Sequence, residues 1–477
     1  MKTQSLTIFL ALLFLISASP LFGQRVLTLQ TCVDLAYERS LELKNADLNT
    51  AFAEVGATQA KHARYPSLNA QTTYGLNVGR TIDPTTNAFV NQSSTFQTGG
   101  VNTSVPIYQG SSITNTIKQT QVDIEAAHQR KAALQDNIGL QVAQNYLNAL
   151  LAEESQILAG IQINLTENQL ERIQRLIDAG SLPPNDRLEL EAQLARDEQQ
   201  IINAENSYQL AILNLKNILL IPVDDSITLE RVDPDLIEID DAILNKSLGE
   251  IYREALIYQP SIRADSLDLL SSNFDKKIAE GRALPSLSLG GSLSTNYSSL
   301  AQRVAGVEDV TNNVPLVIAG NVVDVGFPGQ NRIFEDAPYG NQIGNNLGYG
   351  FGMTLSLPIY NNLNAKLNIE RAELGILQTR NRNEINKQNL KATIQNAVAQ
   401  ARAAKKAYAA SIKSVDVQRI SLENLEKSLA AGRANNFDFI SAKNNLNIAE
   451  NSLVQSKYDY IFKLKVIDYY LGNPLKL

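Results

Sequence analysis

The chain has 477 residues, of which 44% are hydrophobic, with a formal net charge of −7 at pH 7 and a single cysteine. This length suggests about three domains of ordinary size, and the acidic balance argues against nucleic acid as a partner. One cysteine excludes an internal disulfide.

Residues 1–23 have the pattern of a secretory signal peptide. Lys2 precedes an apolar run from Leu6 to Ile16, and small and polar residues follow up to an expected cleavage point near Gly23. The mature chain is therefore predicted to be exported. No later segment reaches the roughly 18 to 20 continuous apolar residues of a membrane helix, so any membrane crossing would be made by strands in a closed barrel.

The rest of the chain contains an internal duplication. Tyr-Pro-Ser-Leu at 65–68 recurs as Leu-Pro-Ser-Leu at 284–287, and Val-Pro-Ile-Tyr at 105–108 recurs as Leu-Pro-Ile-Tyr at 357–360. The first pair is offset by 219 residues and the second by 252, so the second half carries an insertion of 33 residues. A period of this length indicates a duplicated domain and not a solenoid.

The duplication predicts the organisation of the mature chain. A first repeat covers residues 24–225, a linker covers 226–245, and a second repeat covers 246–477. Each repeat has the same expected order, which is a helix, two strands around a loop, and two very long helices.

Two unusually long helices are predicted in corresponding places. Residues 110–178 contain no proline, apolar or small residues recur there every three or four positions, and 362–430 repeats this pattern. At 1.5 Å per residue each helix would be about 100 Å long. A glycine turn follows each, and helices are expected to return over about 186–219 and 438–471. Each half should therefore end in a helical hairpin with a coiled-coil-like seam.

Four strands are predicted between the short and the long helices, at 67–78, 95–107, 286–297 and 347–359. Each is long enough to cross a bilayer when tilted. Four strands cannot close a barrel with room inside, and open strand edges do not occur in lipid. Three copies that pool their strands would supply about twelve, an even number within the range of outer-membrane barrels. The sequence therefore predicts an oligomer.

The insertion falls between the third and fourth strands. Residues 298–346 contain several glycines and break all periodicity, which predicts a long irregular loop, whereas the counterpart at 80–92 is short. Both strand pairs would enter the bilayer from the helical, periplasmic side. The long loop is therefore expected outside the cell.

These features together resemble the TolC-like outer-membrane efflux protein family over essentially the whole mature chain. The most specific are the paired strand-to-helix junctions, with Pro106 and Tyr108 in the first half and Pro358 and Tyr360 in the second. The resemblance implies a mixed, mainly α fold and a trimer. In it, a shared twelve-stranded outer-membrane β-barrel with four strands per chain continues into a long periplasmic α-helical barrel.

The resemblance also implies a function and partners. The chain would be the outer-membrane exit duct of a tripartite efflux pump or type I secretion system, a passive channel gated at its periplasmic tips, without cofactor or metal. Its partners would be two further copies, a periplasmic adaptor (membrane fusion) protein, an inner-membrane transporter and outer-membrane lipid. The residues expected to dock the adaptor are Gly180, Ser181 and Leu182 in the first tip and Gly432, Arg433 and Ala434 in the second.

In the family, the aspartate that matches Asp438 faces the pore at the tip constriction. A second acid often follows three residues later, but here that position is Ser441, and the expected tip arginine is replaced by Ala434. A clamp between the tips would then use Arg433 with Asp186 instead, or be weaker than in the family. The plainer alternative is that both aspartates are first-turn acids favoured by the helix dipole.

Other functions find less support in the sequence. His62 and His128 are isolated on helical patterns without metal-ligand spacing, and no nucleophile or phosphate-binding motif occurs, which disfavours an exported enzyme. Cys32 follows a weak lipoprotein-like box, but its helical surroundings favour a buried cysteine over a lipidated one. The alternative to a duct is a soluble periplasmic coiled-coil scaffold whose short strands form a small sheet.

Overall fold

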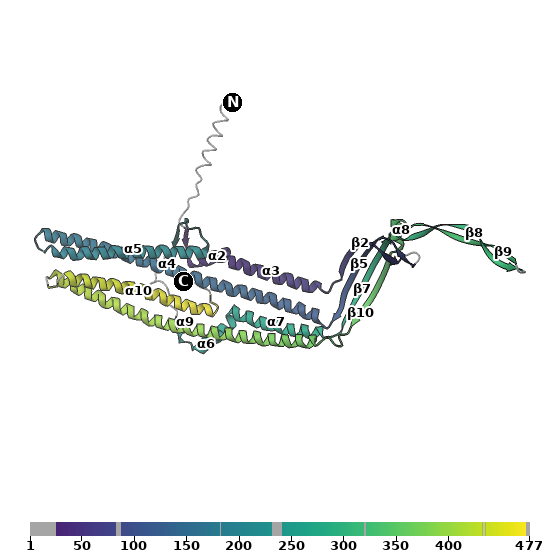
Figure 1. Ribbon diagram of the computed structural model, residues 1–477. Coiled ribbons are helices and arrows are strands. Elements are labelled where there is room, and N and C mark those ends of the chain that lie inside the picture. The colour runs from purple at the N-terminus through teal and green to yellow at the C-terminus, as the bar shows by residue number, and fades with distance from the viewer. Residues whose placement is uncertain are drawn as a thin grey trace, which may run out of the picture. The chain divides into compact units, whose positions relative to one another are not determined.

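A computed structural model describes most of the mature chain and places it in two compact units (Figure 1). The helical unit comprises Met1–Ala53, Asp123–Leu269 and Gln378–Leu477, and the strand unit comprises Glu54–Val122 and Leu270–Leu377. The described residues are 25–82, 87–181, 183–230, 241–318, 321–431, 433–434 and 436–473. The expected signal peptide at 1–23 lies outside them.

The predicted long helices and their returns are confirmed within two residues at each end. The first hairpin consists of α4, Ser112–Asp178, and α5, Asn185–Leu219. The second hairpin consists of α9, Asn364–Ala430, and α10, Asn436–Tyr470. The lengths match between the halves, with 67 residues in α4 and α9 and 35 in α5 and α10.

Each half begins with two shorter helices. The first half has α2, Leu29–Arg39, and α3, Leu41–His62, and the second has α6, Leu248–Tyr258, and α7, Pro260–Arg282. Local capping explains where they start. The Thr28 hydroxyl accepts a hydrogen bond from Thr31 N, and Ser247 and Glu250 form a complete capping box.

A first apolar core joins α2, α4 and α5 to two short strands. Strand β1, Arg25–Leu27, pairs in parallel with β6, Ile227–Leu229. Tyr146 is fully buried, and its hydroxyl donates to the carbonyls of Leu27 and Glu230 at 3.2 and 3.1 Å. Cys32 is also fully buried in this core, as predicted, and burial raises the pKa of its thiol to about 12. Other buried residues of this core include Val142, Leu147, Leu150, Leu215 and Leu219, with Tyr458 from α10.

A second core joins α6, α9 and α10. It includes Ile251, Ile394, Val398 and Ile467, all almost completely buried. Asp241, which precedes the short 3-10 helix η2, Ala242–Asn245, accepts hydrogen bonds from Lys405 on α9 and Tyr460 on α10. These bonds hold the pKa of the Asp241 carboxyl below its usual range.

The strand unit contains one four-stranded antiparallel sheet in the order β10-β7-β5-β2. The strands are β2, Ser67–Asn77; β5, Ser94–Gln109; β7, Ser286–Ser298; and β10, Gly348–Ser356. All four predicted strands are therefore confirmed. The fourth ends three residues earlier than expected, before Pro358, because proline cannot donate to a strand ladder.

The expectation of an irregular loop at 298–346 was wrong. This segment forms a long hairpin of β8, Gln302–Ile318, and β9, Asn321–Asp336, followed by the short helix α8, Tyr339–Asn345. Arg303 pairs with Glu335 near its base. Both strands contain several β-branched residues, Val304, Val307 and Val310 in β8 and Val322, Val325 and Ile333 in β9, which favour a strand despite the glycines. The shorter counterpart also pairs, as β3, Arg80–Ile82, with β4, Phe89–Asn91.

One buried side chain fastens the base of the hairpin to the sheet. The amide of Gln342 on α8 accepts from Ser298 N at 2.9 Å and donates to the carbonyls of Ser298 and Ala337 at 3.0 and 2.8 Å. Ala337 N in turn donates to the carbonyl of Ala301 at 2.9 Å. The two ends of the hairpin are therefore adjacent and fixed to the end of β7.

Among the helices that the structure describes, none combines the length and the hydropathy needed to cross a bilayer. His62 and His128 are both exposed, as their isolated positions suggested. Within the described ranges, no group of three or more histidine, cysteine or acidic side chains could hold a metal ion.

Candidate functional site

The four-stranded sheet has two faces of different chemistry, because directly paired residues in antiparallel strands point to the same side. Pairs such as Leu293 with Tyr349 and Leu289 with Met353 place apolar residues opposite one another on one face. The large residues of this apolar face are Leu68, Tyr74, Leu76, Val101, Val105, Tyr108, Leu287, Leu289, Leu293, Tyr297, Tyr349, Phe351, Met353 and Leu355.

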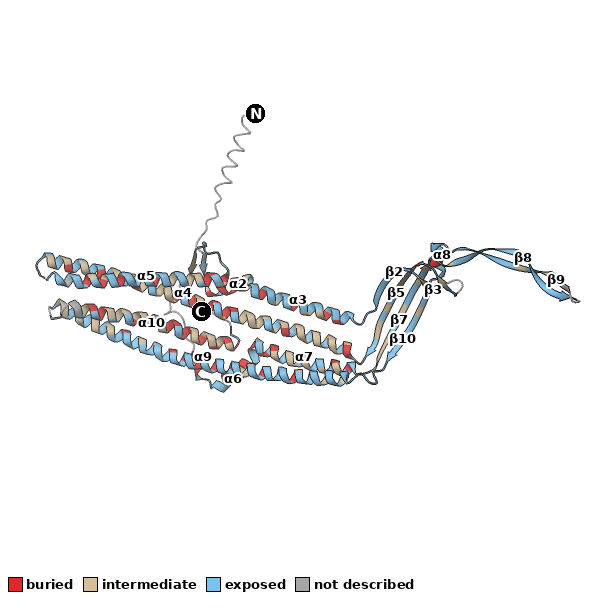
Figure 2. Cartoon of the chain, viewed as in Figure 1, coloured by how far each residue is buried: buried red, intermediate tan, exposed pale blue. Residues whose placement is uncertain are grey.

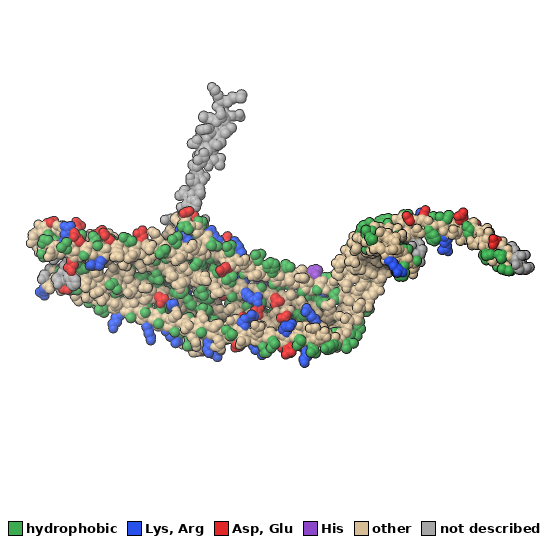
Figure 3. All heavy atoms as spheres, viewed as in Figure 1, with side chains coloured by type: hydrophobic (Ala, Val, Ile, Leu, Met, Phe, Trp, Pro, Cys, Tyr) green, Lys and Arg blue, Asp and Glu red, His purple; other side chains and the backbone are tan. Residues whose placement is uncertain are grey.

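The opposite face is polar and uncharged. Pairs such as Asn102 with Ser292 belong to it, and its one aromatic residue, Phe96, lies over Gly75. Its other residues are glycines, Pro106 and the polar side chains of Ser67, Asn69, Gln71, Thr73, Asn77, Ser94, Thr98, Ser104, Gln109, Ser286, Ser288, Ser294, Asn296, Ser298, Thr354 and Ser356. None of the residues of these four strands is charged. Figure 3 shows the charged side chains on the helices and near the hairpins.

Among the described residues, α8 covers only one end of the apolar face, where the Tyr339 ring packs against Tyr297 at 5.1 Å. Phe351 is 86% exposed and Tyr349 is 80% exposed, and the sheet is largely exposed or half-buried throughout (Figure 2). The edge strands β2 and β10 each pair on one side alone. A sheet with one continuous apolar face, one neutral polar face and two open edges is not a complete structure in water.

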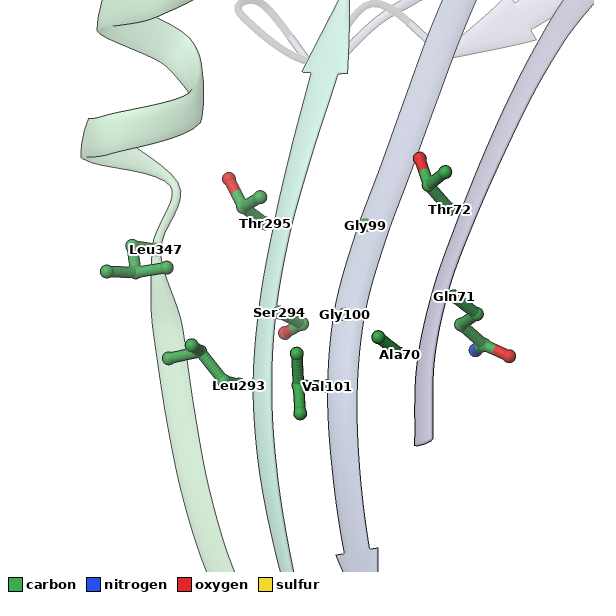
Figure 4. Close-up of a pocket in the computed structure, with 10 residues that line it drawn as sticks. All are labelled: Ala70, Gln71, Thr72, Gly99, Gly100, Val101, Leu293, Ser294, Thr295 and Leu347. Carbon is green, nitrogen blue, oxygen red and sulfur yellow. The ribbon is translucent and has the colours of Figure 1, made fainter. Parts of the chain in front are cut away.

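A shallow depression of about 360 Å³ lies in the apolar face at Gly99 (Figure 4). The side chains of Thr72 and Thr295 flank this glycine, and an added Cβ there would lie 3.9 Å from each. Val101 and Leu293 form its floor toward the middle of the sheet. The depression therefore results from a missing side chain and contains no charged group.

The two predicted strand-to-helix junctions differ in detail. In the first half, β5 continues through Pro106 and Tyr108 to Gln109, with a β-bulge between Pro106 and Tyr108. The pairing of β5 with β2 ends at Ser104, so Pro106 pairs with β7 alone. The missing N–H of Pro106 therefore breaks no hydrogen bond to β2. In the second half, Pro358 and Tyr360 follow the end of β10.

Both junctions then turn into the long helix with the same backbone conformation. Gly110 and Ser111 before α4 have φ of +58° and +63°, and Asn362 and Leu363 before α9 have φ of +54° and +62°. Two successive left-handed residues are unusual for side chains other than glycine or asparagine. The turn from strand to helix is therefore a specified element in both halves, which the Pro-Ile-Tyr motif located only approximately.

Gly110 is required for a further reason that the sequence did not reveal. A Cβ at Gly110 would lie 1.9 Å from the carbonyl oxygen of Gly281, and a Cβ at Gly281 would lie 2.4 Å from the carbonyl oxygen of Gly110. The end of α7 therefore meets the β5–α4 junction backbone to backbone. No local pattern connects two glycines so far apart in sequence.

The first helical tip closes with a Schellman motif. Gly180 has a φ of +69°, as its position predicted, Gly180 N donates to Ile177 O at 2.8 Å, and Ser181 N donates to Leu176 O at 2.9 Å. In the second tip Arg433 N donates to Ser428 O, also at 2.9 Å, so Arg433 holds the place of Ser181. Leu182 and Gly432 lie outside the described residues. Ala434 is half-buried.

The structure places the predicted gate residues at the tip ends of the hairpins. Asp438 is exposed in the first turn of α10, and Arg433 is exposed one turn earlier. Asp186 is the second residue of α5, and its side chain lies outside what the structure describes. A pair between Arg433 and Asp186 therefore stays a prediction.

Comparisons with known proteins give the family from the sequence and the fold from the structure. The model of the outer membrane efflux protein family matches residues 32–219 and 251–473, which together make up most of the chain. The outer membrane protein TolC of Salmonella enteritidis is 26% identical over 187 residues, which cover 39% of this chain and 38% of that protein. The chain therefore matches well under half the length of that relative.

Solved structures of outer-membrane channels share the fold. CusC superposes with a TM-score of 0.73 at 16% identity over 94% of this chain and 92% of its own. VceC of Vibrio cholerae superposes with a TM-score of 0.71 at 13% identity, over 94% of this chain and 97% of its own. The open state of MtrE of Neisseria gonorrhoeae superposes with a TM-score of 0.68 at 18% identity, over 94% of this chain and 89% of its own. With the family model matched over most of its length, the chain belongs to the TolC-like outer membrane efflux protein family.

Proposed function

We propose that this protein is the outer-membrane exit duct of a tripartite efflux pump or a type I secretion system, a passive channel that reaches into the periplasm. The observation that carries the proposal is the two-faced, uncharged sheet. Its apolar face is suited to lipid and its polar face to a water-filled lumen. The family consists of channel proteins, which supports a role without catalysis.

The open edges of the sheet support a trimer. Backbone groups at the edges of β2 and β10 need partners in a bilayer, where water cannot supply them. Pairing β2 of one copy with β10 of the next would close a shared barrel of about twelve strands from three copies. In that arrangement the β8–β9 hairpin would lie outside the cell and the helices in the periplasm.

A soluble periplasmic scaffold is the weaker alternative. A soluble protein rarely leaves a continuous apolar surface uncovered, whereas Phe351, Tyr349 and Leu68 are each more than 70% exposed on one face of this sheet. The absence of charge on both faces of these strands is also unusual for a surface in contact with water on each side.

A pair of substitutions on neighbouring residues of β5 tests the proposal. Val101→Arg would place a charge on the apolar face near the middle of the strand, at a cost of about 2 to 4 kcal/mol per copy in lipid. We expect it to abolish the heat-modifiable trimer in outer-membrane fractions. Asn102→Arg, on the polar face, should assemble like the unchanged protein. If both variants assemble equally well, or the detergent-solubilised protein is a stable monomer, the sheet does not face lipid in a shared barrel.

The helical tips are the proposed docking and gating region. The turns at Gly180 and Arg433 end the two hairpins, and an adaptor and an inner-membrane transporter in the periplasm would meet the duct there. Three-fold symmetry would arrange Asp438 as a ring of carboxylates, which favours cations. Arg433 and Asp186 are proposed to hold neighbouring tips together.

The carboxylate ring makes a prediction about conductance. Asp438→Asn should lower the cation-to-anion permeability ratio in planar bilayers toward 1 and relieve block by multivalent cations, because it removes the charge of the ring. Ser441→Asp, one helical turn farther, should strengthen that block by adding a second ring. If Asp438→Asn leaves both properties unchanged, Asp438 acts only on its helix terminus and the constriction lies elsewhere.

A further inference from the structure

Near the tips, α10 meets the first hairpin through a buried layer of polar side chains, here called the polar seam. Its members are Gln162 and Thr166 on α4, Gln193 and Asp197 on α5, and Lys443 on α10, each less than 9% exposed. An apolar cluster that includes Leu190 and Ile440 lies on its tip side, and the core around Tyr146 and Tyr458 lies on the other. All of these residues belong to the helical unit.

The hydrogen bonds of the seam are divided unequally between its two sides. Asp197 accepts from the Thr166 hydroxyl at 2.6 Å and from the Gln193 amide at 2.7 Å, so its bonds lie wholly within the first hairpin. Asn444 of α10 bonds across, accepting from Gln162 at 3.2 Å and donating to Gln193 at 3.3 Å. These hydrogen bonds across the seam join neutral amides, and hydrogen bonds to water can replace them at little cost in free energy.

Lys443 is the unsatisfied member. Its side chain is buried, and its Nζ atom has no hydrogen-bond partner among the described residues. Burial lowers the pKa of this amine to about 8, and the charge of Asp197 offsets only part of that effect. An ammonium group held out of water without hydrogen bonds is costly, even with a counterion nearby.

Few other charges act on Lys443 from the packed helices. The seam residues of α4 are neutral, and Arg196 of α5 donates its guanidinium hydrogen bonds to Gln193. Arg419 on α9 and Glu450 on α10 form an ion pair with an N–O distance of 3.9 Å, and Glu450 lies about two helical turns beyond Lys443 along α10. Asp197 is therefore the charge that partly compensates Lys443.

We propose that Lys443 is a built-in destabilising charge that favours separation of α10 from the first hairpin. Separation would return the ammonium group to water, whereas Asp197 would keep both of its hydrogen bonds. A cleft of about 280 Å³ lies between the same three helices, farther from the tips. Its lining is mixed, with polar residues such as Ser155, Asn203 and Asn451 beside the apolar Leu151 and Val454. Separation would give water a path along the helices from this cleft.

The proposal has a defined pH dependence. In the closed seam the pKa of Lys443 is lowered from 10.5 to about 8, so the separated state binds more protons between these two values. The bias toward separation is complete below about pH 8 and is lost as the pH rises toward 10.5. The pKa difference sets an upper limit of about 300-fold on the shift in population. The consequence for opening of the duct rests on the proposed function.

Paired spin labels on the assembled, full-length protein can test this. Labels at the exposed positions Glu198 on α5 and Asn445 on α10, introduced as Glu198→Cys and Asn445→Cys, report the distance across the seam. Cys32 is buried and does not compete for the label. We expect Lys443→Met to reduce the separated population several-fold at pH 7.5, whereas Lys413→Met, at an exposed position on α9, leaves it unchanged.

The unchanged lysine provides a second measurement that does not depend on folding of the variant. Raising the pH from 7.5 to 10 should reduce the separated population in the protein with Lys443 and have little effect in Lys443→Met. Equal populations in the two proteins, or the same pH response in both, would overturn the proposal. The distances require no transport, so a channel without export activity that shows these shifts would contradict the proposed function alone.

Discussion

Substitution of Gly110 by alanine is expected to lower the stability of the strand unit by about 3 kcal/mol or more, among the larger effects that one residue can have. The new Cβ would lie 1.9 Å from the carbonyl oxygen of Gly281, and φ at this position is +58°. Steric overlap with backbone cannot be relieved by a side-chain rotation, so α7 or the β5–α4 junction must move.

The melting temperature of the detergent-solubilised protein measures this effect, together with the yield of assembled protein. Gly375→Ala is a matched control, because Gly375 is a helical glycine of the same unit with nothing within 4 Å of an added Cβ. Alanine favours a helix interior, so this control should be neutral or slightly stabilising. Similar melting temperatures for the two variants would show that Gly110 and Gly281 are not in close backbone contact.

The second large effect is expected at the tips. Bulky substitution of both tip glycines, Gly180→Trp with Gly432→Trp, should abolish export while the trimer still assembles. A Cβ at Gly180 meets nothing within 4 Å, so the new ring would project from the tip and block the surface proposed to receive an adaptor. Because φ at Gly180 is +69°, some local strain is also expected.

Accumulation of a fluorescent cargo in cells that contain the complete pump measures export, and heat-modifiable migration measures assembly. Gly180→Asn is the control for strain, because asparagine tolerates positive φ and adds little bulk. It should retain export. Normal export by the double tryptophan variant would indicate that partners bind the sides of the helices and not the tips.

Sequence periodicity was sufficient to predict the positions of the long helices and of the four strands of the sheet. The absence of proline over 110–178 and the regular spacing of apolar residues predicted α4 within two residues. The hairpin at 302–336 was missed because its glycines and the lack of a regular apolar period suggested a loop. Its two strands pair with each other, and this pairing depends on contacts that local periodicity does not contain.

Some features of the candidate sites could likewise be predicted from local sequence, and others depend on contacts between distant segments. The turn at Gly180 follows from local backbone conformation, so the sequence was enough to place it. The contact of Gly110 with Gly281 and the burial of Lys443 depend on helices far apart in the chain. A lysine followed by two asparagines gives no sign in sequence that it faces another helix. Whether Asp438 lines a constriction depends on contacts between copies, which a single chain's pattern does not contain.

The way the β8–β9 hairpin is attached bears on how this protein can vary. Its ends meet through the hydrogen bond between Ala301 and Ala337, and Gln342 bonds to Ala337 and to Ser298 at the end of β7. The sheet therefore keeps its register whatever the length of the chain inserted between those ends. A hairpin attached in this manner is a module that can lengthen, shorten or change in sequence without disturbing the four-stranded sheet.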